Sequence, residues 1–152
     1  GLVILRRSMY QSMRTIEAKK YINVVACVLK KNDKILIASR PETKNFSGFF
    51  EFPGGKVEKD EYLIEALDRE INEELGIRLD FSKIYYLNHY RILELKISLH
   101  FFLCLRWFGK ITNKEKQTLK WILPNELNNF NLLKSNESFK IFLNNFIFPT
   151  TH

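Results

Sequence analysis

The 152-residue chain contains 45% hydrophobic and 14% aromatic residues, which excludes intrinsic disorder and suffices for one domain with a buried core. Its 24 basic and 17 acidic residues give a net charge of +7, and no apolar run approaches the eighteen or so residues of a membrane span, so we expect no membrane association. Two cysteines, Cys27 and Cys104, lack metal-binding or redox spacing, and we expect buried thiols in a cytoplasmic protein.

A single domain is expected over residues 21–152, because the chain contains no repeat, no low-complexity stretch and no linker rich in Pro, Gly or Ser. Residues 1–20 are basic and weakly patterned. We interpret them as a loose N-terminal arm, part of it added in cloning because the first residue is Gly.

Secondary structure can be predicted from periodicity and turn residues. Runs rich in β-branched and aromatic residues predict strands over residues 22–29, 35–38, 83–93, 95–108 and 121–123, the first two forming a hairpin. Helical periodicity predicts a helix over residues 61–75, a helical turn from Pro124 to Leu127 and a last amphipathic helix over residues 135–147. Strands and helices mix without strict βαβ order, which favours an α/β sandwich around a mixed β-sheet.

The helix over residues 61–75 has one apolar side and one polar side, and Gly76 is a suitable residue to end it. At about 100° per residue, the apolar stripe consists of Leu63, Leu67, Ile71 and Leu75. On the opposite side we expect a set of solvated residues, Glu61, Glu65, Asp68 and Asn72.

Three carboxylates, Glu70, Glu73 and Glu74, share one face of this helix at i, i+3 and i+4. Glu74 falls within the apolar stripe, where its carboxylate must lose water and would repel Glu70. Hard oxygen ligands in this number, with no nearby His or Cys, favour Mg²⁺ or Mn²⁺ over Zn²⁺. We therefore expect a metal site here rather than a plainly solvated acidic face.

Charge along the whole chain fits the same interpretation. Residues 51–80 hold ten acidic and four basic residues, a net charge of −6, which leaves +13 on the rest of the chain. An acidic centre in a basic protein suits a polyanion bound through divalent cations. Nucleic acid needs an uninterrupted basic face, so we expect a small molecule and no stable nucleic-acid partner.

The acidic helix is part of a longer motif, which reads Gly55-x5-Glu61-x7-Arg69-Glu70-Ile71-x-Glu73-Glu74-Leu75-Gly76-Ile77. It matches every specified position of the Nudix box, a coincidence expected on the order of once in 10⁸ starts. The preceding segment, Glu51-Phe52-Pro53-Gly54-Gly55-Lys56, resembles the lead-in of the MutT-type branch, the 8-oxo-dGTP diphosphatases. The resemblance covers about residues 22–147 and implies a Nudix α/β/α sandwich around a mixed sheet, with a loop–helix–loop at the site.

The resemblance also implies roles for individual residues. It assigns metal binding and catalysis to the Gly55 carbonyl, Glu70, Glu73 and Glu74. Arg69 is expected to orient a catalytic glutamate, and Glu61 to support the site. Glu115 aligns with a loop glutamate that serves as a further metal ligand or base, although a glutamate in a Lys-rich loop is ordinarily just solvated. The implied cofactor is Mg²⁺, with Mn²⁺ as the alternative, and the implied products are a nucleoside monophosphate and pyrophosphate.

Residues outside the box are expected to choose the substrate. Asn136 matches the asparagine that reads the base in MutT-type enzymes, and its amide can donate to a purine O6 and accept from the N7–H that only the 8-oxo base carries. Capping of the last helix is the alternative role of Asn136. Arg40 and Phe52 match further pocket positions, with core packing an equal alternative for Phe52.

Other functions stay open at this point. The substrate of a Nudix hydrolase could be a pyrimidine triphosphate, an RNA 5′ end or ADP-ribose, and the lack of a proline between Pro53 and Pro124 weakens the last of these. A catalytically dead nucleotide-binding domain is disfavoured because every glutamate of the box is present. Residues 91–95 stand where MutT-type enzymes have a more polar turn between the two long strands. The resemblance therefore does not support sugar or phosphate contacts there. His89 and His100 are expected to be packing or surface residues, and the protein to be a monomer.

Overall fold

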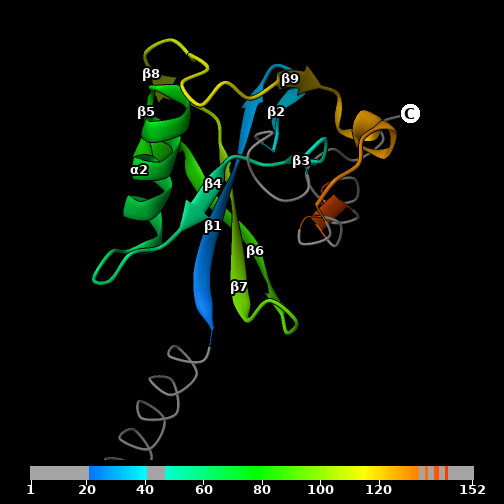
Figure 1. The fold of residues 1–152 in the computed structure, drawn as a ribbon. Helices are drawn as coiled ribbons and strands as arrows, with labels where there is room; N and C mark the ends of the chain where they lie inside the picture. Colours follow the sequence, from blue (N-terminus) through cyan, green and yellow to red (C-terminus); the bar gives the residue numbers. More distant parts are fainter. Residues whose placement is uncertain (1–20, 41–46, 134–135, 137–138, 141–142, 144–152) are drawn as a thin grey trace, which may run out of the picture.

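A computed structural model describes residues 21–40, 47–133, 136, 139–140 and 143 (Figure 1). The arm expected over residues 1–20 and most of the helix expected over residues 135–147 lie outside the described residues. The strands are β1 (Ile22–Lys31), β2 (Lys34–Ser39), β3 (Phe50–Glu51), β4 (Gly54–Lys56), β5 (Arg78–Leu79), β6 (Ile84–Ile92), β7 (Ile97–Cys104), β8 (Trp107–Phe108) and β9 (Leu119–Ile122). The helical elements are α2 (Leu63–Leu75) and two 3₁₀ helices, Phe81–Lys83 and Pro124–Asn129.

Strand β1 is the centre of a mixed sheet with the order β3-β2-β1-β7-β6. It pairs in parallel with β7 along eight residues and antiparallel with β2 and β4, while β9 pairs with β2. A second, two-stranded sheet joins β5 and β8. The expected mixed sheet with a hairpin at its start is therefore confirmed.

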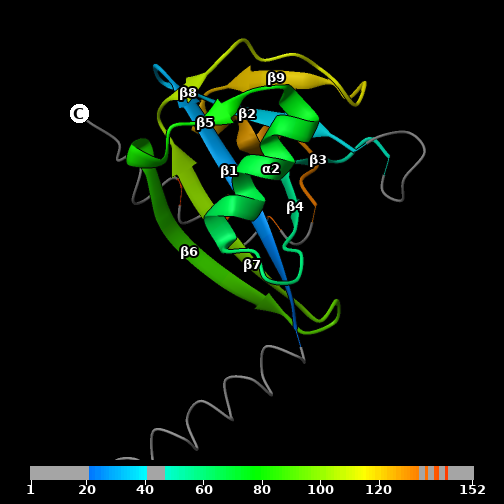
Figure 2. The ribbon, with the colours of Figure 1, turned by 90° about the vertical axis from the view of Figure 1, so that its left-hand side faces the viewer.

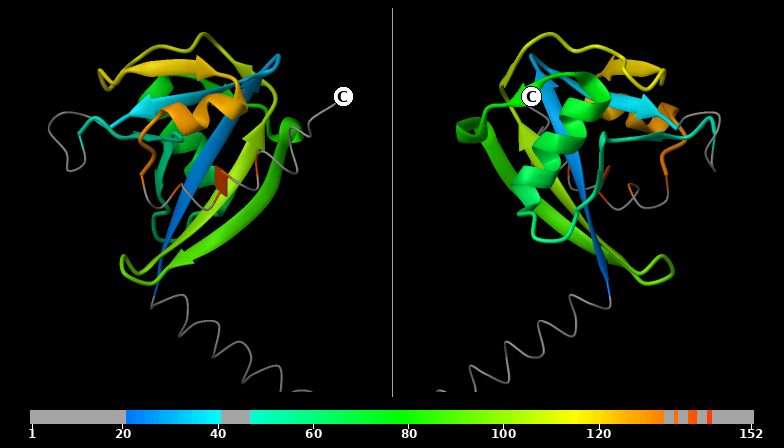
Figure 3. Two further views of the ribbon diagram at one scale, coloured as in Figure 1. Left: turned by 90° about the vertical axis from the view of Figure 1, so that its right-hand side faces the viewer. Right: turned by 60° about the vertical axis from the view of Figure 1, so that its left-hand side comes forward.

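Both faces of β1 are buried, which explains why the segment is apolar throughout. Because side chains alternate along a strand, Val25 and Cys27 face the core beneath α2, whereas Ala26 and Val28 face a second core. Figures 1 and 2 place α2 against one face of the sheet, and Figure 3 shows the 3₁₀ helix Pro124–Asn129 on the other. Cys27 and Cys104 are both buried and free, as expected. Among the described residues, no helix combines the length and apolarity that crossing a bilayer requires.

Helix α2 follows the expected pattern along its buried side. Leu67, Ile71 and Leu75 are fully buried, and Gly76 ends the helix with a left-handed φ of 72°. The helix starts at Leu63, two residues later than predicted. Glu61 lies outside the first turn because its carboxylate accepts a hydrogen bond from the Glu58 N–H at 2.8 Å and also binds Arg69.

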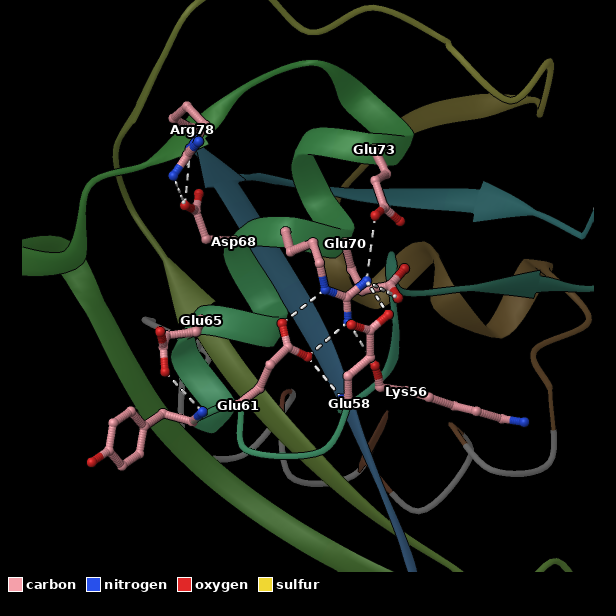
Figure 4. Close-up of polar contacts among 10 residues, drawn as sticks. Lys56, Glu58, Glu61, Glu65, Asp68, Glu70, Glu73 and Arg78 are labelled. Atoms are coloured by element: carbon pink, nitrogen blue, oxygen red, sulfur yellow. Dashed lines mark hydrogen bonds and ion pairs between the residues drawn. The ribbon is translucent and has the colours of Figure 1, made fainter.

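The expected solvation of Asp68 is wrong. Asp68 is only 4% exposed, since β5 covers this side of the helix. Its carboxylate accepts hydrogen bonds from Arg78 Nε at 2.9 Å and from the Leu79 N–H at 2.8 Å, and it pairs with Arg78 Nη2 at 2.6 Å (Figure 4). The aspartate thus ties the helix to the strand that follows it.

The strand boundaries also differ in detail from the prediction. The run over residues 95–108 divides into β7, which ends at Cys104, and β8, which leaves the main sheet to pair with β5. The strand predicted at residues 121–123 instead covers Leu119–Ile122 along β2.

Candidate active site

The chain reversal from β3 into β4 brings two glycines under helix α2. Strand β4 pairs with β1, with Gly55 opposite Val25. A Cβ on Gly55 would lie 2.3 Å from the carboxyl carbon of Glu70, so a side chain there would displace this carboxylate. The Gly55 backbone and the Glu70 carboxylate therefore lie together at one wall of a cavity.

That cavity has a volume of about 570 Å³, and eight of its lining side chains are polar or charged. Two sequence segments far from the helix contribute to it, through Glu115 and through Asn136. The polar lining consists of Arg40, Glu51, Lys56, Glu70, Glu74, Glu115, Gln117 and Asn136. Carboxylates from the motif and the proposed base-reading amide therefore open onto one space.

Burial and mutual repulsion perturb the carboxylates of the cavity. Burial, reinforced by the nearby charges of Glu115, Glu70 and Glu51, raises the pKa of Glu74 to about 9. Burial also raises the pKa of Glu70, although its hydrogen bond from Arg69 acts in the opposite direction. A divalent cation would relieve both the desolvation and the repulsion.

Arg69 donates hydrogen bonds to three carboxylates, those of Glu61, Glu70 and Glu73, which Figure 4 shows gathered around one guanidinium. Its guanidinium donates to Glu61 at 2.8 Å, to Glu70 at 3.0 Å and to the Lys56 carbonyl at 3.0 Å. The carboxylates of Glu61 and Glu70 raise the pKa of Arg69, and the hydrogen bond from the Arg69 guanidinium holds the pKa of Glu61 below its usual value. The arginine thus joins the loop before the helix to the carboxylate that lies against Gly55.

Glu73 lies away from the cavity that Glu70 and Glu74 line. Its side chain is 53% exposed, contacts Arg69 at 3.4 Å and is not part of the cavity lining. Within the described part of the chain, no three acidic, His or Cys side chains already enclose a common point that could hold an ion. The donor set nevertheless fits a hard cation, since the carboxylates of Glu70, Glu74 and Glu115 and the Gly55 backbone adjoin one cavity.

Asn136 and Phe52 are joined across 84 residues of sequence. Asn136 is 4% exposed, and its Oδ1 accepts a hydrogen bond from the Phe52 N–H at 3.1 Å. An N-capping oxygen would accept from the first turn of its own helix, so this long-range bond favours a role at the cavity. Phe52 lines the cavity and also packs edge-on against Phe101 and Phe139, so both of its expected roles are compatible with the structure.

Three polar residues that line the cavity, Glu51, Lys56 and Gln117, had no role predicted from the sequence. Glu51 pairs with Arg40 at 3.4 Å and contributes to the raised pKa of Glu74. Gln117 is 7% exposed and lies two residues after Glu115 in the same loop. That spacing of two, which places alternate residues of an extended segment on one side, is a feature that could have found Gln117.

His89 and His100 lie outside the cavity, as packing or surface residues do. The His100 ring has Nδ1 at 2.8 Å from the Tyr86 hydroxyl and Nε2 at 3.1 Å from Asn23 Oδ1. Burial lowers the pKa of His100 to about 4, so the ring is neutral at physiological pH. It stacks on His89 along the β6–β7 pair.

The buried carboxyl of Glu74 makes stability depend on pH when divalent cations are chelated. Below pH 4.5, the ordinary pKa, the carboxyl is protonated in both states and carries no penalty. As the pH rises towards the folded-state pKa of about 9, the unfolded chain releases this proton and the folded protein keeps it. The Glu74 carboxyl should therefore lower the free energy of unfolding by at most about 1.4 kcal/mol for each pH unit. Thermal unfolding of wild type and Glu74→Gln at pH 6 and pH 8.5 tests this. The advantage of the variant should grow with pH, and a constant difference would contradict the raised pKa.

Comparison with known proteins agrees with this geometry. The Nudix domain model matches residues 19–144. The chain is 37% identical over 117 residues to an 8-oxo-dGTP diphosphatase of Buchnera aphidicola subsp. Schizaphis graminum, covering 77% of this chain and 88% of that protein. It is 40% identical over 108 residues to the CTP pyrophosphohydrolase of Escherichia coli, covering 70% and 79%.

Solved structures show the same relationship. The Escherichia coli ORF135 protein superposes with a TM-score of 0.72 at 33% identity, covering 87% of this chain and 96% of that one. A MutT structure from a study of the Aliivibrio salmonicida and Vibrio cholerae proteins gives 0.71 at 30% identity, covering 82% and 97%. With the box, the fold and the cavity in agreement, the chain belongs to the Nudix hydrolase family and is similar to its MutT-type members.

Proposed function

We propose that this Nudix hydrolase converts 8-oxo-dGTP to 8-oxo-dGMP and pyrophosphate with Mg²⁺ or Mn²⁺ as its cofactor, and so keeps the oxidised nucleotide out of DNA. The observation that carries the proposal is the joint placement of Glu70, Glu74 and Asn136 on one cavity. An 8-oxo-dGTP diphosphatase that is 37% identical to this chain supports the same choice.

The metal-binding groups we propose are the Gly55 carbonyl, Glu70, Glu73, Glu74 and Glu115. Glu73 belongs to this set by its place in the motif and by its contact with Arg69, not by facing the cavity. When bound, a divalent cation neutralises phosphate charge and activates water. Arg69 holds the Glu70 carboxylate in place, and Glu61 in turn holds Arg69.

The carboxylates are also suited to accept a proton from the attacking water. General bases work best when their pKa lies near the operating pH. Burial moves the pKa of both Glu70 and Glu74 upward from 4.5, which makes each carboxylate a stronger proton acceptor. Glu115 opens onto the same cavity from the opposite loop and provides a further acceptor. We assign Arg40, which lines the cavity and pairs with Glu51, to an anionic or hydroxylated part of the substrate.

Base selection is assigned to Asn136. The Phe52 N–H donates to Oδ1 and so orients the amide of Asn136, and an amide oxygen can accept two hydrogen bonds. The N7–H of an 8-oxopurine is such a donor, whereas N7 of guanine is an acceptor. An unpaired buried polar group costs about 1–3 kcal/mol, so guanine should be disfavoured by that amount.

A cytidine triphosphate is the second candidate substrate. The Escherichia coli CTP pyrophosphohydrolase is 40% identical to this chain, and the exocyclic amine of cytosine could also donate to the Asn136 oxygen. A panel of 8-oxo-dGTP, dGTP, CTP, dCTP, ADP-ribose and a 5′-triphosphorylated RNA, assayed with Mg²⁺, separates these choices. We expect the highest kcat/KM with 8-oxo-dGTP. A higher value with a cytidine nucleotide would transfer the assignment to CTP, and no turnover at all would indicate a binding domain.

Location and assembly follow from the same proposal. Buried free thiols suit a reducing compartment, and a nucleotide substrate is found free in the cytoplasm, where we place the protein. We also propose that the enzyme acts as a monomer without a nucleic-acid partner.

Activity should rise towards alkaline pH. The carboxylate cluster titrates as a unit, and metal binding requires its deprotonated form. Since the pKa of both Glu70 and Glu74 is raised, protons compete with the cation over a wider range than at an ordinary glutamate. A profile of kcat/KM from pH 5 to pH 9.5 at saturating Mg²⁺ tests this. A maximum near pH 5 would contradict the mechanism.

A further inference from the structure

Gln117 presents an unusual polar atom at the cavity. The side chain is 7% exposed and forms part of the cavity wall. Its Oε1 is buried and has no hydrogen-bond partner among the described residues. Buried polar atoms in native proteins are nearly always paired. The missing hydrogen-bond donor for this oxygen is therefore expected to come from a bound ligand.

The orientation of the amide is fixed by its other end. Gln117 Nε2 donates to the Ser39 carbonyl at 3.0 Å, and the opposite orientation would place two acceptors against each other. The backbone of Gln117 is held as well, because its N–H donates to Asn113 Oδ1 at 2.8 Å and its carbonyl accepts from Asn113 Nδ2. The unpaired group is therefore an acceptor, and a preorganised one.

The chemistry of a nucleotide narrows the choice of donor. At neutral pH a triphosphate offers acceptors only, so donors come from the sugar hydroxyls or from the base. Gln117 lies two residues from Glu115, which we place with the metal and phosphates, whereas the base is assigned to Asn136. The sugar connects these two parts of the substrate.

We propose that Gln117 is a substrate-binding residue whose Oε1 accepts a hydrogen bond from the 3′-hydroxyl of the nucleotide sugar. The inference rests on the proposed function and adds a third contact, between those to the base and to the phosphates. It makes the enzyme sensitive to the sugar as well as to the base.

A structural role for Gln117 would give a different result. The Nε2 bond to Ser39 anchors the loop that carries Glu115, so losing it could lower activity on every nucleotide alike. Ser39→Ala provides the matched control, because Ser39 Oγ accepts from the Thr118 N–H in the same loop but the serine does not line the cavity.

The test combines changes in the protein with changes in the nucleotide, in the manner of a double-mutant cycle. Wild type, Gln117→Met and Ser39→Ala are assayed with 8-oxo-dGTP, with its 2′,3′-dideoxy analogue and with 8-oxo-dITP, which lacks the 2-amino group. Wild type and Ser39→Ala should favour the 3′-hydroxyl by about five- to tenfold in kcat/KM, and Gln117→Met should lose this preference. An equal loss on all three nucleotides would overturn the proposal, as would a lost preference for the 2-amino group instead.

Binding of the product monophosphates with and without the 3′-hydroxyl, followed by calorimetry, separates this inference from the proposed function. Binding that depends on the hydroxyl and on Gln117, without turnover, would uphold the contact while the enzymatic proposal failed. Turnover without that dependence would overturn the contact alone. If the protein neither binds nor hydrolyses nucleotides, both proposals fail.

Discussion

Glu74→Gln is expected to lower kcat/KM for the preferred nucleotide by about two to four orders of magnitude while the protein remains folded. The substitution keeps the shape of a side chain that is 8% exposed, but it removes the charge that a cation and a proton would bind. It also removes repulsion with Glu70 and Glu115, so the melting temperature without metal should rise. Steady-state kinetics and thermal unfolding measure both effects. Glu73→Gln should also lose orders of magnitude, although its side chain lies outside the cavity lining.

Glu65→Gln is the matched control on the same helix. The Glu65 carboxylate accepts a hydrogen bond from the Tyr62 N–H at 2.9 Å, a contact that a glutamine oxygen can keep. The residue does not line the cavity, so turnover should stay near that of wild type. Near-normal turnover in both Glu73→Gln and Glu74→Gln would refute the assignment of the site to this helix face.

A preference for 8-oxo-dGTP over dGTP of about one to two orders of magnitude in kcat/KM is expected to depend on Asn136. Oxidation at C8 converts the N7 acceptor into a donor, and the amide oxygen can pair only with the donor. Asn136→Ala should therefore reduce turnover of 8-oxo-dGTP far more than that of dGTP. Kinetics on the two nucleotides, in wild type and variant, give the ratio directly.

Two further variants serve as controls for Asn136→Ala. Asn136→Asp keeps an oxygen for the Phe52 N–H and so preserves this bond, while it loses the amide donor to the base O6. Asn128→Ala removes an exposed asparagine from the 3₁₀ helix Pro124–Asn129 and should leave the ratio unchanged. Equal kcat/KM for both nucleotides in wild type would refute the substrate, whereas a large ratio that survives Asn136→Ala would show that Asn136 does not select the base.

Local elements of the fold were predictable because their causes lie within a short stretch of sequence. The apolar stripe through Leu67 and Ile71, with Gly76 after it, was enough to place the body and end of α2. Asp68 was misplaced because helical periodicity describes one helix and not the strand that covers it, and β5 supplies both partners of its carboxylate. The parallel pairing of β1 with β7 joins segments some 75 residues apart, which no local pattern specifies.

In the candidate site, too, features within one element were predictable and contacts between distant segments were not. The carboxylates of α2 are recognisable from spacing alone, because one helix carries them. Contacts between distant segments were not, and the bond from Phe52 to Asn136 and the anchoring of Gln117 on Ser39 arise only when the sheet assembles. The burial of Glu74 was predictable from its place in the apolar stripe, whereas spacing alone did not show that Glu73 lies outside the cavity lining.

The central claim is that this acidic cavity hydrolyses an oxidised nucleoside triphosphate with the help of a divalent cation. Its most direct test is the hydrolysis of 8-oxo-dGTP by wild-type protein with Mg²⁺, with excess chelator, and after Mg²⁺ is restored, with the products separated by chromatography. We predict 8-oxo-dGMP and pyrophosphate in the first and third conditions and no turnover in the second. Equal rates with and without chelator, or release of orthophosphate with 8-oxo-dGDP, would contradict the account.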